Sequence, residues 1–541
     1  MTHRYCFIPG LLLCVLVILF CPSCLNYVDP PKDSPTVLPA YYIDGFCSQI
    51  DEDGTLSFSW SYVSGDFQRL AVSVSEVYAD SSNNHVVLSA EITDVSVTEL
   101  SYDGEAGIVY SYSFTPYGSD GKPGKVFSGT SYAVPGSYEA NLPRLVITTK
   151  DWELPDCDYL THPEGSCGEG ITNNDYVKMD VSLVAPGGEV LYTSGTDKGS
   201  KLKIRGNTSA YGAKKPYKIK LGKKADLLSY ITGRTGNQYK DKEWLLMATG
   251  TGINNVIGFA ANEYMGIEFT PSYAYVELFI NGDYRGVYMI VENVKQGNIS
   301  GTDQARCAVA DDGFIIENDA YWWNEDVYFR TERLHKNFTF KYPDEEDVTA
   351  AQISYIKGCL DAFEQALLKK DDSYADLIDV ESFASWAMVH EYLGCYDSGG
   401  SNQYIMKRDS SADTKLEMTT AWDFDGIMID AEAGRTSNMN RGSFFYTSRL
   451  MFKPSFYEAC KNKYSETRDG IITAVCSRID ALDAGAIDAA GAWDAARWLT
   501  GFASVASQRS KVVSWLKDRL VWMDRSYGVL SHRDIGMPSE E

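Results

Sequence analysis

Residues 382–430 read SFASWAMVHEYLGCYDSGGSNQYIMKRDSSADTKLEMTTAWDFDGIMID, and the order of elements in this stretch decides the fold of the larger part of the chain. Its first third predicts a helix, because apolar residues recur every three or four positions: Phe383, Trp386, Val389 and Leu393. The runs 403–407 and 416–419 predict two short strands. The predicted order is a helix, a polar loop, a hairpin and an acidic loop.

The two loops carry the polar residues of interest. Asp397 stands five positions before Asn402, and Asp423 opens the tetrapeptide Asp-Phe-Asp-Gly that ends at Gly426. Phosphotransferases use this order so that the first Asp orients an attacking hydroxyl while the Asn and the second Asp hold a metal ion. Asp and Asn are also common in turns, because their side chains bond their own backbone. On spacing alone the turn interpretation is favoured.

The composition restricts the class of protein. The chain has 541 residues, enough for several domains, and its 13% aromatic content with 36 tyrosines argues against disorder. A net charge of -25 argues against nucleic acid or an anionic membrane surface as a main partner. The same charge repels ATP at long range, so a nucleotide site would need local basic residues.

Residues 1–24 are typical of a targeting segment. A short basic start precedes the apolar run Leu11–Phe20, which ends at Cys21-Pro22-Ser23-Cys24. This resembles a bacterial lipoprotein signal with Cys24 as the lipidated residue; an ordinary cleaved signal and an uncleaved anchor are the alternatives. No second stretch is long and apolar enough to span a bilayer. We therefore expect a cell-envelope protein, periplasmic or surface-exposed, that contacts the membrane through its N-terminal lipid only, followed by a proline-marked linker over 25–38.

Twelve cysteines are present. Because an exported protein reaches an oxidising compartment, we expect a disulfide between Cys157 and Cys167. Five later cysteines are expected to be buried thiols: Cys307, Cys359, Cys395, Cys460 and Cys476. The sequence contains no zinc, redox or nucleophile-elbow motif.

Residues 39–138 predict a β-sandwich, because short alternating strands such as Leu56–Trp60 and Val109–Phe114 are separated by turn signals. An early-strand Trp60 and a late Tyr-x-Tyr-x-Phe strand resemble a fibronectin type III module. Such modules mostly space and bind, so glycan or surface-protein contacts are expected here rather than catalysis.

A basic strand follows in the second part of the chain. In 217–221 the apolar residues share one face, whereas Lys218 and Lys220 share the other, which favours a solvated face for these two lysines. Lys215 stands at the strand entry beside a Gly-Asn-Thr-Ser turn. A helix is expected over about 253–265. Asn281-Gly282 between apolar runs then predicts a hairpin that ends at Glu292, where a kinase-like fold places its hinge.

Together these segments resemble the spore coat protein H (CotH) kinase family over roughly 143–530. Three motifs carry the resemblance: Arg-Gly-Asn-Thr-Ser with Lys-Lys-Pro-Tyr-Lys in 205–218, Tyr-Val-Glu-Leu-Phe-Ile-Asn-Gly-Asp-Tyr-Arg-Gly-Val-Tyr at 275–288, and Ala-Trp-Asp-Phe-Asp at 421–425. The resemblance implies a multidomain protein: the N-terminal sandwich, then an α+β atypical protein-kinase-like domain with a helical C-terminal part. It also implies phosphoryl transfer from ATP, with Mg²⁺ or Mn²⁺, to Ser residues of an extracytoplasmic protein substrate.

The resemblance also implies roles for single residues. Lys215 would contact nucleotide phosphates and Asp397 would be the catalytic Asp. Asp423 would bind the metal ion, and Asn402 and Asp425 would be secondary metal or structural positions. Arg205 would brace the Gly-Asn turn, and Glu292 would lie at the nucleotide hinge. The chain departs from the family where an acidic residue and an Arg usually open the helix: it has Thr249-Gly250-Thr251-Gly252-Ile253-Asn254-Asn255. This departure bears on whether the helix completes a Lys–Glu pair and whether activity survives.

A rival hypothesis keeps the fold and removes the chemistry. A binding or scaffold protein on a kinase-like fold would suit export to a compartment where ATP is scarce. Export and the sandwich favour this rival, whereas retention of Asp397, Asn402 and Asp423 together favours the enzyme. A third hypothesis is glycan handling through aromatic side chains.

Overall fold

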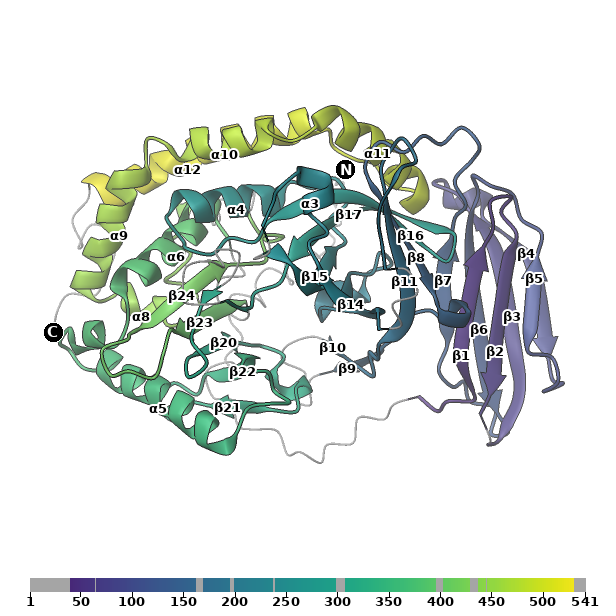
Figure 1. Cartoon of the computed structure of the whole chain (residues 1–541), viewed down its shortest axis with the longest axis horizontal. Helices are drawn as coiled ribbons and strands as arrows, with labels where there is room; N and C mark the ends of the chain where they lie inside the picture. Colours follow the sequence, from purple (N-terminus) through teal and green to yellow (C-terminus); the bar gives the residue numbers. More distant parts are fainter. Residues whose placement is uncertain are drawn as a thin grey trace, which may run out of the picture.

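The computed structural model describes residues 39–529 except 64, 162–168, 195–198, 237–238, 298–306, 396–401, 429–435 and 444. In this part of the chain a β-sandwich, a β-barrel and an antiparallel sheet with helices follow one another in sequence order (Figure 1). The helical C-terminal part lies against the barrel and against the five-stranded sheet that follows the barrel in the chain.

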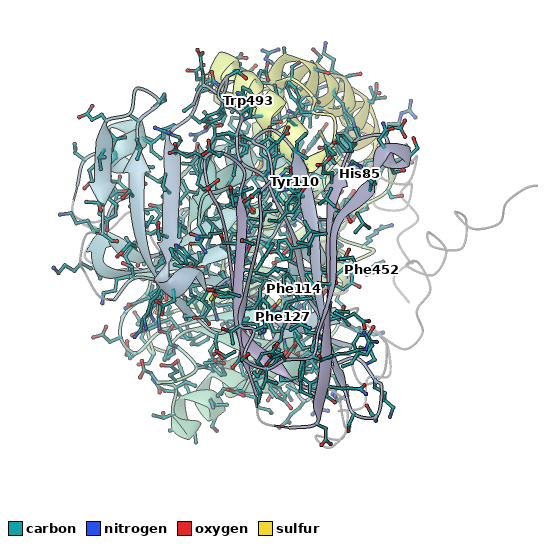
Figure 2. The ribbon with its side chains drawn as sticks, turned by 90° about the vertical axis from the view of Figure 1, so that its right-hand side faces the viewer. His85, Tyr110, Phe114, Phe127, Phe452 and Trp493 are labelled. Atoms are coloured by element: carbon teal, nitrogen blue, oxygen red, sulfur yellow. The ribbon has the colours of Figure 1, made fainter. Side chains whose placement is uncertain are left out.

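The N-terminal sandwich consists of two antiparallel sheets. One has the order β1-β2-β5 and the other β4-β3-β6-β7. The strands are β1 (Ile43–Ile50), β2 (Leu56–Tyr62), β3 (Phe67–Val77), β4 (His85–Ile92), β5 (Glu99–Tyr102), β6 (Val109–Gly118) and β7 (Phe127–Ser131). The predicted alternation is confirmed, because Trp60 and Phe114 lie in the core between the sheets while their neighbours face outward. Figure 2 looks onto this sandwich, with Phe114 and Phe127 along it.

The second unit is a closed barrel. Its strands run in the order β12-β11-β13-β14-β15-β17-β16-β8, and β8 also pairs with β11, so the ring closes and leaves β12 outside it. The strands are β8 (Arg144–Thr149), β11 (Val177–Val184), β12 (Val190–Thr193), β13 (Lys201–Ile204), β14 (Tyr217–Ala225), β15 (Asp241–Met247), β16 (Tyr273–Ile280) and β17 (Asp283–Glu292). Alternate residues fill the interior, as period-two patterning requires.

The predicted hairpin lies at the centre of the barrel wall. Asn281 and Gly282 have φ of 53° and 83°, the two positive values that a type I′ turn requires. Every residue of β17 is buried, as its apolar run over 286–291 predicts for the middle of the strand. The Asn281 side chain accepts a hydrogen bond from the Thr149 backbone N–H (2.9 Å) and donates to the Ser48 carbonyl (3.3 Å). The turn therefore ties the barrel to the sandwich.

Short elements connect these units. They are β9 (Asp158–Thr161), β10 (Glu169–Thr172), α2 (Thr208–Tyr211), α3 (Ser229–Thr232), β18 (Gln296–Gly297) and β19 (Cys307–Ala308). Strands β9 and β10 form a small antiparallel pair beside the barrel end where β14 begins.

A five-stranded sheet of order β21-β22-β20-β23-β24 follows. Its strands are β20 (Phe314–Asn318), β21 (Tyr328–Arg330), β22 (Asn337–Tyr342), β23 (Gln403–Lys407) and β24 (Leu416–Ala421). Helices α4 (Asn254–Tyr264), α5 (Ala350–Leu367) and α6 (Val380–Leu393) pack into one apolar cluster with it. The predicted order in 382–430 is confirmed: α6 ends at Leu393 and the hairpin β23–β24 follows.

The C-terminal helices run along the outside of this cluster (Figure 1). They are α8 (Thr447–Leu450), α9 (Pro454–Thr467), α10 (Ile471–Asp480), α11 (Ala484–Trp498) and α12 (Val505–Met523). On α11, Arg497 donates to the Tyr284 carbonyl and to the Thr130 carbonyl of the sandwich, both at 2.7 Å. Because Asp283 also accepts from the Tyr132 backbone N–H (3.0 Å), helix, barrel and sandwich meet around one buried ion pair.

Within the described residues, no helix is long and apolar enough to cross a bilayer. The five later cysteines are free thiols; Cys359 and Cys476 are half-buried rather than buried. Cys157 is a free, buried thiol, and its expected partner Cys167 lies outside the described residues. Cys24 lies outside them as well.

Candidate active site

The hairpin β23–β24 brings two polar residues from its two ends together. Asn402 directly precedes β23 and Asp423 follows β24, and the pairing of Gln403 with Ala421 sets them side by side. The Asn402 amide donates to Asp423 Oδ2 at 3.2 Å. Both residues have a left-handed backbone, with φ of 65° and 62°. Non-glycine residues rarely adopt this conformation, and such strain concentrates at functional sites.

Asp423 and Asp425 form a pair of carboxylates whose environment disfavours their charges. Burial raises the pKa of Asp423, against the positive charge of Arg205 and the hydrogen bond from Asn402. Burial and then the negative charge of Asp423 raise the pKa of Asp425 to about 6. A cation bound between the two carboxylates would relieve both effects.

Helix α4 begins at this pair. Asn255 donates from Nδ2 to Asp425 Oδ1 at 3.5 Å, and Asn254 donates to the Asp425 carbonyl at 3.4 Å. The Phe424 ring lies on Gly258 of the same helix, where an added Cβ would come within 2.0 Å of a ring carbon. The segment that departs from the family pattern therefore contacts the acidic loop through amides rather than through charged groups.

Strand β20 adds carboxylates that the sequence reasoning missed. Glu317 accepts from the Asn402 backbone N–H at 3.2 Å and pairs with Lys341 at 2.8 Å. Two residues along, burial and the charge of Glu317 raise the pKa of Asp319 to about 7. A glutamate inside the apolar run Phe-Ile-Ile-Glu-Asn was the signal available in the sequence, because a buried strand rarely keeps an unpaired carboxylate.

The outer face of the barrel supplies the basic groups on this side of the molecule. Lys218 pairs in register with Leu245, which belongs to the same apolar cluster as α4 and Phe424, and Lys203 pairs with Lys218. Directly paired residues of antiparallel strands project to the same face. Glu243 holds Lys218 at 3.0 Å and Lys295 at 2.8 Å. Lys218 is thus an ion-paired, partly buried residue and not the solvated one that its pattern suggested.

Arg205 lies on the same side. It follows β13, its backbone N–H donates to the Pro216 carbonyl, and alternation places it with Lys203 on the outer face. Its charge lowers the pKa of Asp423 and of Asp425 against the effect of burial. Arg205, Asn402, Asp423 and Asp425 are therefore brought together by the structure.

Lys215 is not brought together with them. It shares the alternation of Tyr217 and Ile219, whose side chains fill the barrel, and so it lies at the barrel mouth on the opposite side of the strand. Its ammonium donates to the Tyr159 hydroxyl at 2.7 Å and to the Ala210 carbonyl at 2.8 Å. This position does not support a contact between Lys215 and a nucleotide held at Asp423.

Two other predicted residues have different outcomes. The Glu292 carboxylate pairs with Arg234 at 2.8 Å and accepts from the Ser272 backbone N–H at 2.8 Å, so it braces the end of β17. Asp397 lies outside the described residues, in the segment between the α6 C-cap Gly394 and Asn402.

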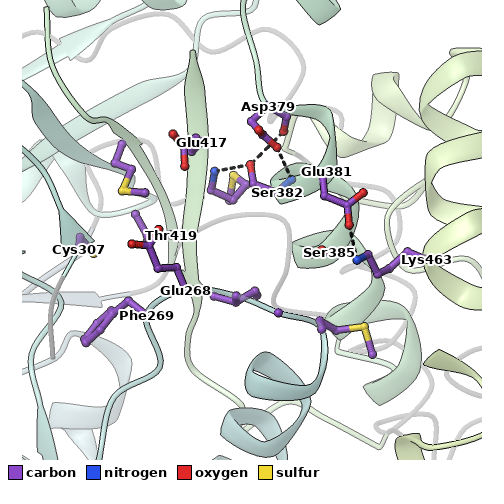
Figure 3. A pocket seen from close by; sticks show the side chains of 15 residues that line it. Glu268, Phe269, Cys307, Asp379, Glu381, Ser382, Ser385, Glu417, Thr419 and Lys463 are labelled. Atoms are coloured by element: carbon purple, nitrogen blue, oxygen red, sulfur yellow. Dashed lines mark hydrogen bonds and ion pairs between the residues drawn. The ribbon is translucent and has the colours of Figure 1, made fainter. Parts of the chain in front are cut away.

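A separate pocket of about 220 Å³ lies between α6, β24 and the turn after α4 (Figure 3). Its polar side chains bond one another: Asp379 caps α6 through the Ser382 backbone N–H at 2.7 Å, and Lys463 pairs with Glu381. None of the residues around Asp423 lines it. We assign no chemistry to this pocket.

Among the described residues, no group of three or more His, Cys, Asp or Glu side chains is arranged to hold a metal ion. Two carboxylates and an amide are nevertheless enough protein ligands for Mg²⁺, which keeps several waters and binds substrate phosphates. The residues present therefore fit a nucleotide-bound metal better than a metal held by protein alone.

A comparison with curated proteins finds no match. The family model described as CotH kinase protein matches residues 202–523, which run from within β13 through the acidic loop to the end of α12. This match covers more than half of the 541 residues, and the resemblance seen in the sequence motifs agrees with it. The chain belongs to the CotH kinase protein family.

Proposed function

We propose that this protein is an exported atypical kinase that transfers a phosphoryl group from metal-bound ATP to a Ser hydroxyl of an extracytoplasmic protein substrate. The single observation that carries the proposal is the bonded pair Asn402–Asp423, two left-handed residues at the ends of one hairpin with Asp425 beside them. Family membership supports a possible kinase in general terms. Catalysis of this type depends on positioning and charge neutralisation.

Asp423, Asp425 and Asn402 would hold Mg²⁺ or Mn²⁺ through oxygen atoms. When bound, the metal would neutralise negative charge on the nucleotide phosphates. The chain's own residues do the rest. Glu317 fixes Asn402 through its backbone N–H, and the left-handed backbone at both positions presents the amide and carboxylate toward each other.

We assign phosphate neutralisation to Lys218 and Arg205 instead of Lys215. Both lie on the barrel face that packs against α4 and the second sheet, and Glu243 orients Lys218. Asp397 is proposed to orient the substrate hydroxyl, since it stands five residues before Asn402. In this assignment Lys218 and Glu243, both in the barrel, form the Lys–Glu pair. The absence of charged residues at the start of α4 therefore does not remove this pair.

The remaining parts of the proposal concern architecture and location. The three-strand and four-strand sheets of the sandwich support a fibronectin type III-like module, and the barrel with α4 and β20–β24 supports a kinase-like domain. Cys24 would carry the lipid that anchors the chain to a bacterial membrane. The negative net charge supports a protein partner over nucleic acid.

Calorimetric titration of the chain without residues 1–38 tests the proposal. We expect Mg²⁺-dependent ATP binding that Asp423→Asn weakens at least about tenfold, equivalent to about 1.4 kcal/mol. Asn tolerates a left-handed backbone, so this substitution removes the charge without adding strain. The matched control is Asp413→Asn, which changes an exposed carboxylate in the turn of the same hairpin. Equal affinity in wild type and Asp423→Asn, or no ATP binding by the folded wild type, would refute the proposal.

The second candidate is a binding protein on the same fold. One observation favours it: α4 meets the acidic loop with Asn254 and Asn255 at a position where the family has charged residues. Under this alternative the folded protein binds no ATP in the same titration.

A further inference from the structure

A large cavity lies between the sandwich and the mouth of the barrel. It measures about 1040 Å³, a size suited to a small organic ligand. The sandwich contributes Phe127 and Lys125 to its lining, and Tyr217 and Arg285 line it from the barrel. Phe127 is labelled in Figure 2, on the sandwich. The cavity is separate from the acidic loop, because its lining includes neither Asn402 nor Asp423.

Arg285 is a buried cation with an incomplete set of partners. The residue is only 8% exposed, and its guanidinium meets Asp283 at 2.9 Å. Asp283 is shared with the fully buried Arg497, 3.4 Å away, so two guanidinium groups have one carboxylate between them. Nε of Arg285 makes its contact with Oδ2 of Asp283, the carboxylate that Arg497 also shares. A buried cation in this condition is costly unless a further anion reaches it.

Lys215 is a second such cation in the same lining. It donates only to neutral oxygens, those of Tyr159 and Ala210. Desolvation lowers its pKa against the charges of Cys157 and Asp156, and the nearby charges of Lys125 and Arg285 act in the same direction as desolvation. Lys125 in the same cavity is different, because Asp156 and Asp158 both pair with it. The positive charge without a carboxylate of its own therefore lies at Lys215, which has no direct carboxylate contact, and at Arg285, which shares Asp283 with Arg497.

The rest of the lining suits hydroxyl groups and a ring. Carboxylates of Asp156 and Asp175 lie at exposed positions and can accept hydroxyl hydrogen bonds, and Tyr159 and Tyr176 contribute aromatic rings to the lining. Sugars present this combination, with hydroxyls at the ring edge and apolar C–H faces. The same carboxylates would repel a ligand with several negative charges, so a nucleotide triphosphate is disfavoured here.

We propose that this cavity binds an acidic sugar, a uronic or sialic acid, with its single carboxylate held between Lys215 and Arg285 and its hydroxyls bonded to the acidic rim. The site is built jointly by the sandwich and the barrel. It does not depend on the proposed kinase activity, because it uses the opposite side of strand β14 from Lys218.

Titration calorimetry of the full-length protein tests this site with three probes, D-glucuronate, D-galacturonate and N-acetylneuraminate, and with D-glucose as the neutral control. We expect at least one acidic sugar to bind with a dissociation constant of about 1 mM or tighter and D-glucose not to bind. Lys215→Met should weaken binding at least about tenfold, since it removes the ammonium that pairs with the carboxylate. The matched control is Lys220→Met on the outer face of the same strand, which should bind like wild type.

Two further variants keep the test decisive. Arg285→Lys retains a charge at the buried position but loses the planar donor set, so it should also weaken binding. Asp423→Asn should leave sugar binding unchanged, which separates this site from the proposed ATP site. The inference is overturned if none of the three acids binds, if D-glucose binds equally well, or if a folded Lys215→Met protein binds the acid with wild-type affinity.

Discussion

We expect the stability of the α-helical part of the chain to depend strongly on the buried ion pair Arg519–Glu391. Both side chains are 0% exposed, and Arg519 Nη2 meets Glu391 Oε2 at 2.9 Å. Arg519 on α12 also donates to the carbonyls of Glu391 (2.8 Å) and Ser437 (2.9 Å). Glu391 accepts from the backbone and side chain of Asn440. The pair joins the last long helix to the C-terminal turn of α6, directly before the loop that leads to Asn402.

Removing one partner leaves a buried charge without a counter-charge, which costs about 3–5 kcal/mol. We therefore expect Arg519→Leu to lower the free energy of unfolding by that amount. Replacing both residues, Arg519→Leu with Glu391→Leu, should cost less than Arg519→Leu alone, because no buried carboxylate remains. The measurement is urea unfolding followed by circular dichroism at pH 7, with slopes compared between variants.

Arg509→Leu is the matched control on the same helix. Arg509 pairs with Asp480 at 2.6 Å, but the two side chains are 38% and 54% exposed, so we expect a much smaller change than for Arg519→Leu. The reasoning is wrong if Arg519→Leu costs no more than Arg509→Leu. It is also wrong if the double variant is less stable than Arg519→Leu, since burial of an unpaired charge would then not be the dominant cost.

Two further predictions concern nucleotide binding and acid stability. Lys218→Met should weaken Mg²⁺-dependent ATP binding about tenfold while Lys215→Met leaves it unchanged; the reverse result in calorimetry would return the phosphate role to Lys215. Burial lowers the pKa of His390 to about 3, so the native state stays neutral while the unfolded state gains a proton below about 6.5, and stability falls as pH drops from 6.5 to 3. His390→Leu should remove up to about 5 kcal/mol of this loss in the free energy of unfolding. The check is the urea midpoint at pH 7 and at pH 4.5. An equal shift of the midpoint between these pH values in wild type and in His390→Leu would contradict the prediction.

Much of the local structure was predictable because it depends on short-range patterns. The Asn281-Gly282 turn, the helix before Gly394 and the strand 403–407 all follow from periodicity and turn chemistry. The contact between Asn402 and Asp423 follows from the same reasoning, because a hairpin of two short strands returns its second end to its first. Whether Asp397 takes the role proposed for it remains a prediction.

The basic strand shows where local reasoning stopped too early. Lys215 was favoured because it stands at the strand entry, yet its odd position places it with Tyr217 and Ile219, which were already expected to be buried. Alternation alone would have assigned Lys215 to the inner side and Lys218 to the outer side. What alternation could not supply was the partner, because Glu243 reaches Lys218 only through the pairing of β14 with β15, across 25 residues of sequence.

The closure of the barrel could not be predicted from the sequence for a related reason. It depends on the pairing of β8 with both β11 and β16, and the strand patterns specify which residues face inward but not which strands meet. The Glu317 carboxylate belongs to the site because β20 pairs with β23, which brings it to the Asn402 backbone N–H. Neither relation has a short-range signal.

The distribution of positive charge gives the two proposed sites a common explanation. A chain with a net charge of -25 repels anions, so any anionic ligand must be met by cations that are held in place. Strand β14 and its entry hold such cations on two sides: Lys218 outside the barrel with Glu243 as its partner, and Lys215 at the mouth with neutral partners only. An outer lysine fixed by a carboxylate suits a highly charged ligand that brings its own metal. A desolvated inner lysine without a carboxylate suits a ligand that brings one negative charge of its own.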